Sequence, residues 1–152
     1  MEVIYALKYK GFTKIGIEFG KLLGNRLLLD RFSKYDALIP VPIHHARKRE
    51  RGYNQSKLIA EGVGQIIKVP INTNIIKRKI YTQTQTLLKS DERKINVADA
   101  FAPTSPNLKL NGKIFLLIDD VLTTGSTLNS CANLLLELGS KRVDVATLVI
   151  AN

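Results

Sequence analysis

The residues best suited to chemistry lie in one short segment, where two adjacent carboxylates are followed by a run of hydroxyl side chains. Asp119 and Asp120 come directly after an apolar run. The loop that follows contains Thr123, Thr124, Gly125, Ser126 and Thr127. Carboxylates accept hydrogen bonds from sugar hydroxyls, whereas side-chain hydroxyls and backbone N–H groups donate to phosphate. This spacing predicts a site for a ribose 5-phosphate, with the phosphate on the loop and the sugar on the acids.

The elements around this segment must place it at the edge of a sheet. The apolar stretch within Lys113–Asp120 predicts a strand buried on both faces. A helix capped by Ser126 or Thr127 then runs to about Leu138, and Gly139 ends it with a positive φ. Ligands of open α/β sheets bind at the carboxyl ends of strands, where the next helix offers unpaired N–H groups. The loop is not a Walker phosphate loop, because it contains no Gly-Lys-Ser/Thr.

The rest of the chain alternates between helical and strand patterns. Apolar residues at three- and four-residue spacing predict a helix over 13–32, and leave open a shorter one over 2–9. Further predictions are a strand over 36–40, a helix from the N-cap Asn54 to about Ile67, a strand over 71–76 and a last strand over 142–150. Between them, residues 77–111 read as a long irregular stretch with a short helix at 91–95. Strands that alternate with helices predict an α/β fold with a mostly parallel central sheet flanked by helices.

Composition narrows the classes of protein. The chain has 152 residues, a formal net charge of +10 and a single cysteine, Cys131. One cysteine cannot form an internal disulfide, and no apolar run approaches the roughly 20 residues that a membrane span needs. We expect a cytoplasmic protein with one domain over residues 1–152, divided into a helical part at 1–35 and an α/β core at 36–152. The excess of cations favours a phosphate-rich substrate or a nucleic acid.

The carboxylate and threonine segment resembles the signature with which type I phosphoribosyltransferases bind phosphoribosyl pyrophosphate (PRPP). The resemblance extends along the chain to the ComF family, named from bacterial competence for DNA uptake. It rests on the segments 6–11, 40–42, 48–55 and 85–88, with Arg93, 96–97 and Phe101. The same core is also similar to the PRPP domain of amidophosphoribosyltransferase. ComF proteins usually begin with a four-cysteine zinc ribbon, and this sequence has no such segment.

The resemblance implies a type I phosphoribosyltransferase fold with a small N-terminal helical hood, and pentosyl transfer from PRPP with Mg²⁺. Asp119 and Asp120 would hold the ribose hydroxyls and act as the catalytic pair. The loop from Thr123 to Thr127 would hold the 5′-phosphate. Pyrophosphate and lid contacts are expected at Arg49, Arg51, Gly52, Gln85 and Arg93. No direct protein cage for the metal is expected, since Mg²⁺ would come with PRPP and reach the protein through the two acids.

Three functions remain open at this stage. The first is an enzyme of nucleotide metabolism whose acceptor is unknown. Purine-salvage members of the family carry an Asp base where this sequence has Thr123, which argues against that chemistry. The second is a DNA-uptake protein that binds single-stranded nucleic acid through its basic loops, and the third is a PRPP sensor that binds without catalysis. A homodimer is also left open.

Overall fold

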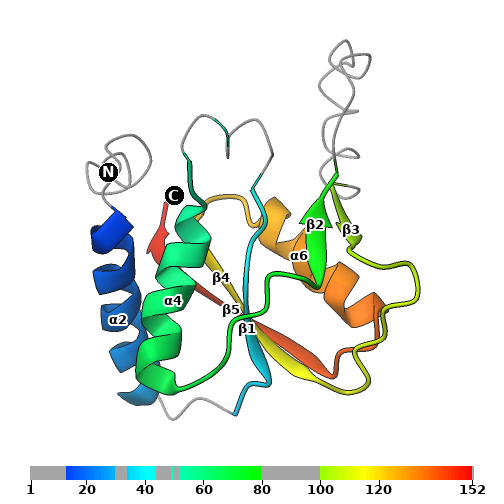
Figure 1. The fold of residues 1–152 in the computed structure, drawn as a ribbon, viewed down its shortest axis with the longest axis horizontal. Coiled ribbons are helices and arrows are strands. Elements are labelled where there is room, and N and C mark those ends of the chain that lie inside the picture. Colours follow the sequence, from blue (N-terminus) through cyan, green and yellow to red (C-terminus); the bar gives the residue numbers. More distant parts are fainter. Residues whose placement is uncertain (1–12, 30–33, 44–48, 50–51, 80–99, 152) are drawn as a thin grey trace.

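The core of the protein is a parallel sheet of three strands in the order β1-β4-β5 (Figure 1). The computed structural model describes residues 13–29, 34–43, 49, 52–79 and 100–151. The elements in chain order are α2 (Thr13–Leu29), β1 (Ala37–Pro40), α4 (Gln55–Ile67), β2 (Ile76–Arg78), β3 (Phe101–Pro103), β4 (Ile114–Leu122), α6 (Ser126–Glu137) and β5 (Arg142–Ile150). The predicted α/β fold with a parallel sheet is confirmed. No helix of the described ranges is long and apolar enough to cross a membrane.

The register of the sheet brings the carboxyl ends of its strands to one edge. Ala37 of β1 lies opposite Phe115 of β4, and Ile114 of β4 lies opposite Arg142 of β5. The apolar run of β4 is the centre of the sheet, and its residues Phe115–Ile118 are buried, as predicted. Beyond them the strand continues to Leu122, two residues further than predicted, because Val121 and Leu122 pair with β5. The two acids therefore lie inside the last part of the strand.

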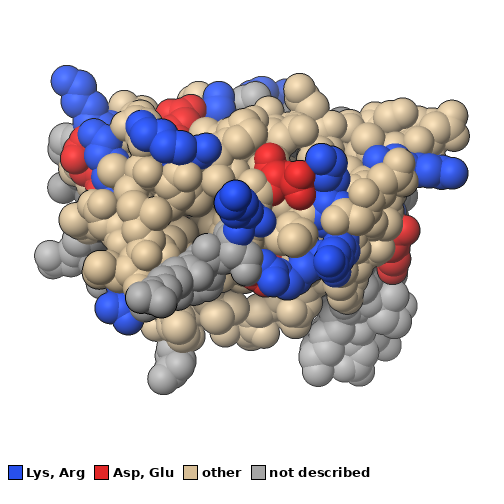
Figure 2. Space-filling view, turned by 90° about the horizontal axis from the view of Figure 1, so that it is seen from below, with Lys and Arg blue, Asp and Glu red and all other residues tan. Residues whose placement is uncertain are grey.

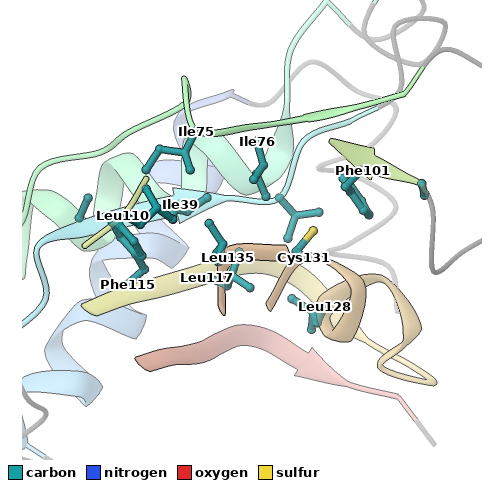
Figure 3. Close-up of a cluster of buried hydrophobic side chains, with 13 residues drawn as sticks. Ile39, Ile75, Ile76, Phe101, Leu110, Phe115, Leu117, Leu128, Cys131 and Leu135 are labelled. Atoms are coloured by element: carbon teal, nitrogen blue, oxygen red, sulfur yellow. The ribbon is translucent and has the colours of Figure 1, made fainter. Parts of the chain in front are cut away.

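Each face of the sheet is covered by a separate apolar cluster. On one face, Leu116 and Ile118 pack against Ile59 and Val63 of α4 and against Leu27 of α2. On the other face, β1 and β4 pack against α6 and against the β2–β3 hairpin (Figure 3). The residues of this second cluster that Figure 3 labels are Ile39, Ile75, Ile76, Phe101, Leu110, Phe115, Leu117, Leu128, Cys131 and Leu135. The result is a three-layer arrangement that holds α4 and α6 against the same strand.

Helices α2 and α4 lie unusually close together because glycines face each other where they cross. A Cβ atom added to Gly20 would overlap the carbonyl oxygen of Ile59, and one added to Gly62 would overlap that of Ile17. Each site would also place the added atom within 2.9 Å of further backbone atoms of the partner helix. Only hydrogen fits at these positions, so the glycines that weaken a helix by about 1 kcal/mol each serve the packing.

The predicted strand over 71–76 is wrong, since the strand β2 covers Ile76–Arg78 and Ile71 forms only an isolated bridge with Leu38. The side chain of Asn72 accepts a hydrogen bond from the N–H of Asn74, and this local turn interrupts the strand. The stretch 77–111 contains a second strand that the sequence pattern did not predict. That strand is β3, which pairs antiparallel with β2 and brings Phe101 opposite Arg78.

The ends of the helices agree with prediction at α4 and differ at α6. Asn54 caps α4, and its side chain accepts from the N–H of Ser56. At α6 the N-cap residue is Gly125, with φ 75° and no side-chain cap, so that Ser126 is already the first helical residue rather than the cap. Gly139 has the predicted positive φ. The predictions for 2–9 and 91–95 lie outside the described residues, as does the end of the helix predicted to reach residue 32.

Candidate functional site

Asp119 is held in place from two directions at the end of β4. Its Oδ1 atom accepts a hydrogen bond from the hydroxyl of Ser56, at 2.8 Å, and another from the backbone N–H of Asp120, at 2.9 Å. Ser56 belongs to the first turn of α4, so this contact joins two elements that are distant in the sequence. The carboxylate is half-buried and lies opposite Thr147 of β5. Its orientation is therefore set by the protein before any ligand arrives.

Asp120 follows at the same edge, half-buried, and the loop after β4 leads from it to α6. Thr123 and Thr124 are exposed on this loop. Gly125 then takes a left-handed conformation, which favours glycine, and turns the chain into the helix. The prediction that the strand, the loop and the helix follow one another here is confirmed.

The first turn of α6 offers donors to a ligand at the loop. The hydroxyls of Thr124 and Ser126 lie 2.9 Å apart, and the N–H of Ser126 is 3.4 Å from the Thr124 hydroxyl. The opening N–H groups of a helix lack intrahelical acceptors, and the helix dipole adds partial positive charge. The N-cap residue Gly125 supplies no side-chain cap, and the Thr124 hydroxyl accepts from the Ser126 N–H only at 3.4 Å. The first turn is therefore suited to an anion such as a phosphate.

The start of α4 forms the other wall beside Asp119. Besides capping the helix, Asn54 donates from Nδ2 to the carbonyl oxygen of Val41, at 3.0 Å, directly after β1. Gln55 is buried, and its Nε2 atom has no hydrogen-bond partner. Gly52 precedes them with φ 78° and an open surrounding. The loop before α4 is thus anchored to the sheet at its end.

The Asp119 carboxylate interacts electrostatically with Cys131 in the core of the domain. The pKa of the Cys131 thiol is raised, mainly because the side chain is buried and further because the Asp119 carboxylate is near. Arg78 of β2 acts in the opposite direction, and its guanidinium also lies 5.4 Å from the centre of the Phe101 ring. Cys131 is fully buried and belongs to the core. Among the residues that the structure describes, no group of three His, Cys, Asp or Glu side chains could hold a metal ion.

A cleft of about 460 Å³ lies next to the carboxylates rather than at them. It runs between the end of β1, the first turns of α4 and strand β2, with Pro40, Tyr53, Lys57 and Arg78 among its walls. Asn54 lines this cleft, while Ser56 on the same helical turn holds Asp119. The start of α4 therefore contributes both to the wall of the cleft and to the position of Asp119.

The structure places some of the predicted site residues together, places others elsewhere, and does not describe the rest. Asp119 to Thr127 lie together on one strand, one loop and one helical turn. Gly52 stands at the entry to α4, and Arg49 is exposed. Arg51, Gln85 and Arg93 lie outside the described residues. Sequence reasoning missed Ser56, because a serine in an amphipathic helix gives no signal of a partner 63 residues away.

Comparison with known proteins identifies one matching family model and several similar sequences. The family model described as "Phosphoribosyl transferase domain" matches residues 40–152. The chain is 38% identical over 110 residues to Competence protein F of Haemophilus influenzae, covering 72% of this chain and 48% of that protein. It is 31% identical over 147 residues to DNA utilization protein YhgH of Escherichia coli, covering 94% and 63%. The chain thus spans about half to two thirds of the length of these relatives.

Among solved structures, a purine phosphoribosyltransferase from Pyrococcus horikoshii superimposes with a TM-score of 0.52 at 22% identity. The match covers 88% of this chain and 72% of that one. At this level of identity the likeness concerns the fold, and it agrees with the parallel sheet and its flanking helices described above.

Proposed function

Because the chain belongs to the phosphoribosyl transferase domain family, we propose that it binds PRPP and transfers the phosphoribosyl group to an acceptor, with release of pyrophosphate. The observation that carries this proposal is the fixed carboxylate of Asp119 at the end of β4. It is followed within one loop by the first turn of α6, whose N-cap residue Gly125 supplies no side-chain cap. A sugar phosphate needs both an acceptor for its hydroxyls and a donor set for its phosphate, and this strand, loop and helix supply them in sequence.

In this proposal, the 5′-phosphate accepts hydrogen bonds from the N–H and hydroxyl groups of residues 123–127. The ribose hydroxyls donate to Asp119 and Asp120. Carboxylate oxygens are the ligands that Mg²⁺ prefers, so the same two acids fit a Mg²⁺ ion that arrives with PRPP. When bound, that ion neutralises charge on the pyrophosphate. Arg49, Arg51 and Gly52 are proposed to contact the pyrophosphate, and Gln85 and Arg93 are proposed as lid residues.

The chain's own contribution to the reaction is positioning. Breaking the bond between C1 and the pyrophosphate develops positive charge on the sugar, and a held ribose brings that carbon to the acceptor at a fixed distance. Thr123 stands where purine-salvage relatives are expected to carry an Asp base, and a threonine hydroxyl cannot take up a proton in that way. The acceptor is therefore proposed to need no base at this position.

The test is calorimetric titration of PRPP with Mg²⁺ into the protein and into Asp119→Asn/Asp120→Asn. We expect binding that the double variant loses while keeping its helical content. No binding by the unchanged protein refutes the proposal. If binding occurs, release of pyrophosphate in a screen of nitrogen acceptors separates a transferase from a sensor that binds PRPP without turnover.

A second candidate function is contact with DNA, as the names of the relatives suggest for those proteins. The observation that favours it is the end of the sheet opposite the site, where Lys34, Lys113 and Lys141 are exposed just before the three strands. Figure 2 shows this end, with blue Lys and Arg side chains gathered around the acidic ones.

Within this basic end, Lys113 pairs with Asp36 and Arg142 pairs with Asp144. A phosphate backbone bound here must show an affinity that falls steeply with salt. The basic loop 47–51 is the other candidate region. We expect single-stranded DNA binding to weaken when Arg47, Lys48, Arg49 and Arg51 are replaced by alanine if the loop carries it. If the basic end carries it, Lys34, Lys113 and Lys141 are the sensitive positions instead. Binding that does not depend on salt excludes both.

A further inference from the structure

The contact between Ser56 and Asp119 ties the first turn of α4 to the candidate sugar site. The hydroxyl of Ser56 donates to Asp119 Oδ1 at 2.8 Å, and the serine is 5% exposed. Hydrogen bonds to an ionised acceptor are the strong ones, and partial burial strengthens them further. The contact therefore joins a buried serine of α4 to an acid of the candidate site.

The position of Ser56 is itself fixed by its neighbours. Its backbone N–H donates to the side chain of Asn54, at 3.1 Å, and Asn54 in turn donates to the Val41 carbonyl at the end of β1. On the next turn, Ile59 and Ala60 are fully buried against the sheet. The hydroxyl therefore projects from a turn that is anchored at both ends, which makes it a rigid reference for the carboxylate.

The two donors described above reach the same oxygen atom of Asp119. Oδ1 accepts from Ser56 and from the N–H of Asp120, at 2.9 Å, and two donors on one oxygen fix the rotation of the carboxylate group. The plane of the carboxylate then decides where Oδ2 points. A sugar hydroxyl that hydrogen-bonds to a carboxylate oxygen gains from having that oxygen already in place.

We propose that Ser56 is a positioning residue for sugar recognition, acting through Asp119. The inference rests on the proposed function, since it takes the ribose of PRPP as the group that Asp119 recognises. Ser56 touches no substrate atom in this scheme. Its role is to hold Oδ1, so that the other oxygen of the carboxylate meets a ribose hydroxyl without first having to rotate.

The alternative is that the hydrogen bond only fastens α4 to the sheet. The two roles differ in what they do to ligands with and without a sugar. A positioning role affects PRPP and spares pyrophosphate, which has no ribose. A fastening role disturbs the start of α4 and the loop before it, so both ligands lose affinity alike.

The experiment compares Ser56→Ala with the unchanged protein by titration of PRPP and of pyrophosphate. Each ligand is titrated with Mg²⁺ to establish binding, and again in EDTA to compare the two proteins, because Mg²⁺ would join pyrophosphate to Asp119. Alanine is a better helix former than serine, so the helix is kept. Ser140→Ala is the matched control. Ser140 is also buried and also donates a hydrogen bond, to the Leu135 carbonyl at 2.8 Å, but it precedes β5 at the opposite end of the sheet.

We expect Ser56→Ala to bind PRPP about tenfold more weakly, on the scale of losing an outer partner of a ligating group. Its affinity for pyrophosphate and both affinities of Ser140→Ala should stay within about twofold. An equal loss for both ligands, or no loss for either, overturns the positioning role. If the unchanged protein binds pyrophosphate but not PRPP, or binds neither, the proposed function fails instead. The two failures are thus distinguished by the first titration.

Discussion

The close crossing of α2 and α4 gives the sharpest test of the packing, through the replacement Gly20→Ala. The added Cβ atom would overlap the carbonyl oxygen of Ile59 and come within 2.9 Å of the Cα atom of Gly62. Both are backbone atoms, so no side-chain rotation can make room. An ordinary carbon–oxygen contact is about 3.3 Å or more. The two helices must therefore separate by roughly 1 Å along this stretch.

The size of the effect follows from two opposing contributions to the free energy of unfolding. Overpacking in a well-packed interior costs about 1–3 kcal/mol, and backbone overlap places this case at the upper end. Replacing a helical glycine by alanine returns about 1 kcal/mol. We expect a net destabilisation of about 2 kcal/mol for Gly20→Ala, and a similar value for Gly62→Ala.

Urea unfolding followed by far-ultraviolet circular dichroism measures this directly, with Gly64→Ala on the partner helix α4 as the comparison. There the nearest atom to an added Cβ is the Val69 carbonyl oxygen, at 3.0 Å, and the others are side-chain carbons at 3.5 Å or beyond. The gain in helix propensity then offsets most of the crowding, so Gly64→Ala should stay within about 1 kcal/mol of the unchanged protein. If Gly20→Ala is as stable as Gly64→Ala, the close approach of the two helices is refuted.

Three other predictions concern single residues. Gly125→Ala and Gly112→Ala should each lose about 1 kcal/mol of stability, because both positions have a φ near 75°, while an added Cβ would meet no atom closer than 3.5 Å at either. Only the Gly125 variant, on the proposed phosphate loop, should lose PRPP affinity in a titration. Hydrogen bonds from the Ile114 N–H and from Lys113 lower the pKa of Asp36 below its usual value. Its contribution to stability is therefore present at neutral pH and lost as the pH falls through this lowered pKa, and the stability gap to Asp36→Asn should close on acidification. Cys131, buried with a raised thiol pKa, should react with iodoacetamide at pH 8 about 100-fold more slowly in the folded than in the unfolded protein.

Local patterns in the sequence were enough to predict those parts of the candidate site whose residues are neighbours in the chain. An apolar run that is long enough to cross a sheet, followed by two acids and a loop of threonines with one glycine, predicts strand β4, its turn and the start of α6. Asn54 likewise predicts the start of α4, because its side chain accepts a hydrogen bond from the N–H of Ser56, two residues along the chain. In these cases the interacting groups are neighbours in the chain, and their spacing carries the information.

The parts that could not be predicted depend on partners far away in the sequence. The strand β3 is three residues long and exists because it pairs with β2. The alternation over 71–76 resembles a strand, yet the turn at Asn72 overrides it. Nothing in the local sequence around Gly62 indicates that this glycine packs against α2. Such pairings depend on contacts that form only when the helices pack onto the sheet, and the pattern of a single sequence does not show these contacts.

The same helix, α4, links packing to the candidate site, which leads to a last prediction. Its middle is set against α2 by the glycine contacts, and its first turn holds Asp119 through Ser56. A hydrogen bond of 2.8 Å does not survive a displacement of its donor by 1 Å with its geometry intact. Gly62→Ala, which pushes α4 away from α2, should therefore weaken PRPP binding as well as stability, when both are measured under conditions where the variant is folded. Gly64→Ala should change neither by much. If Gly62→Ala is destabilised yet binds PRPP with unchanged affinity, the first turn of α4 is positioned by β1 through Asn54 alone, and the glycine contacts serve stability only.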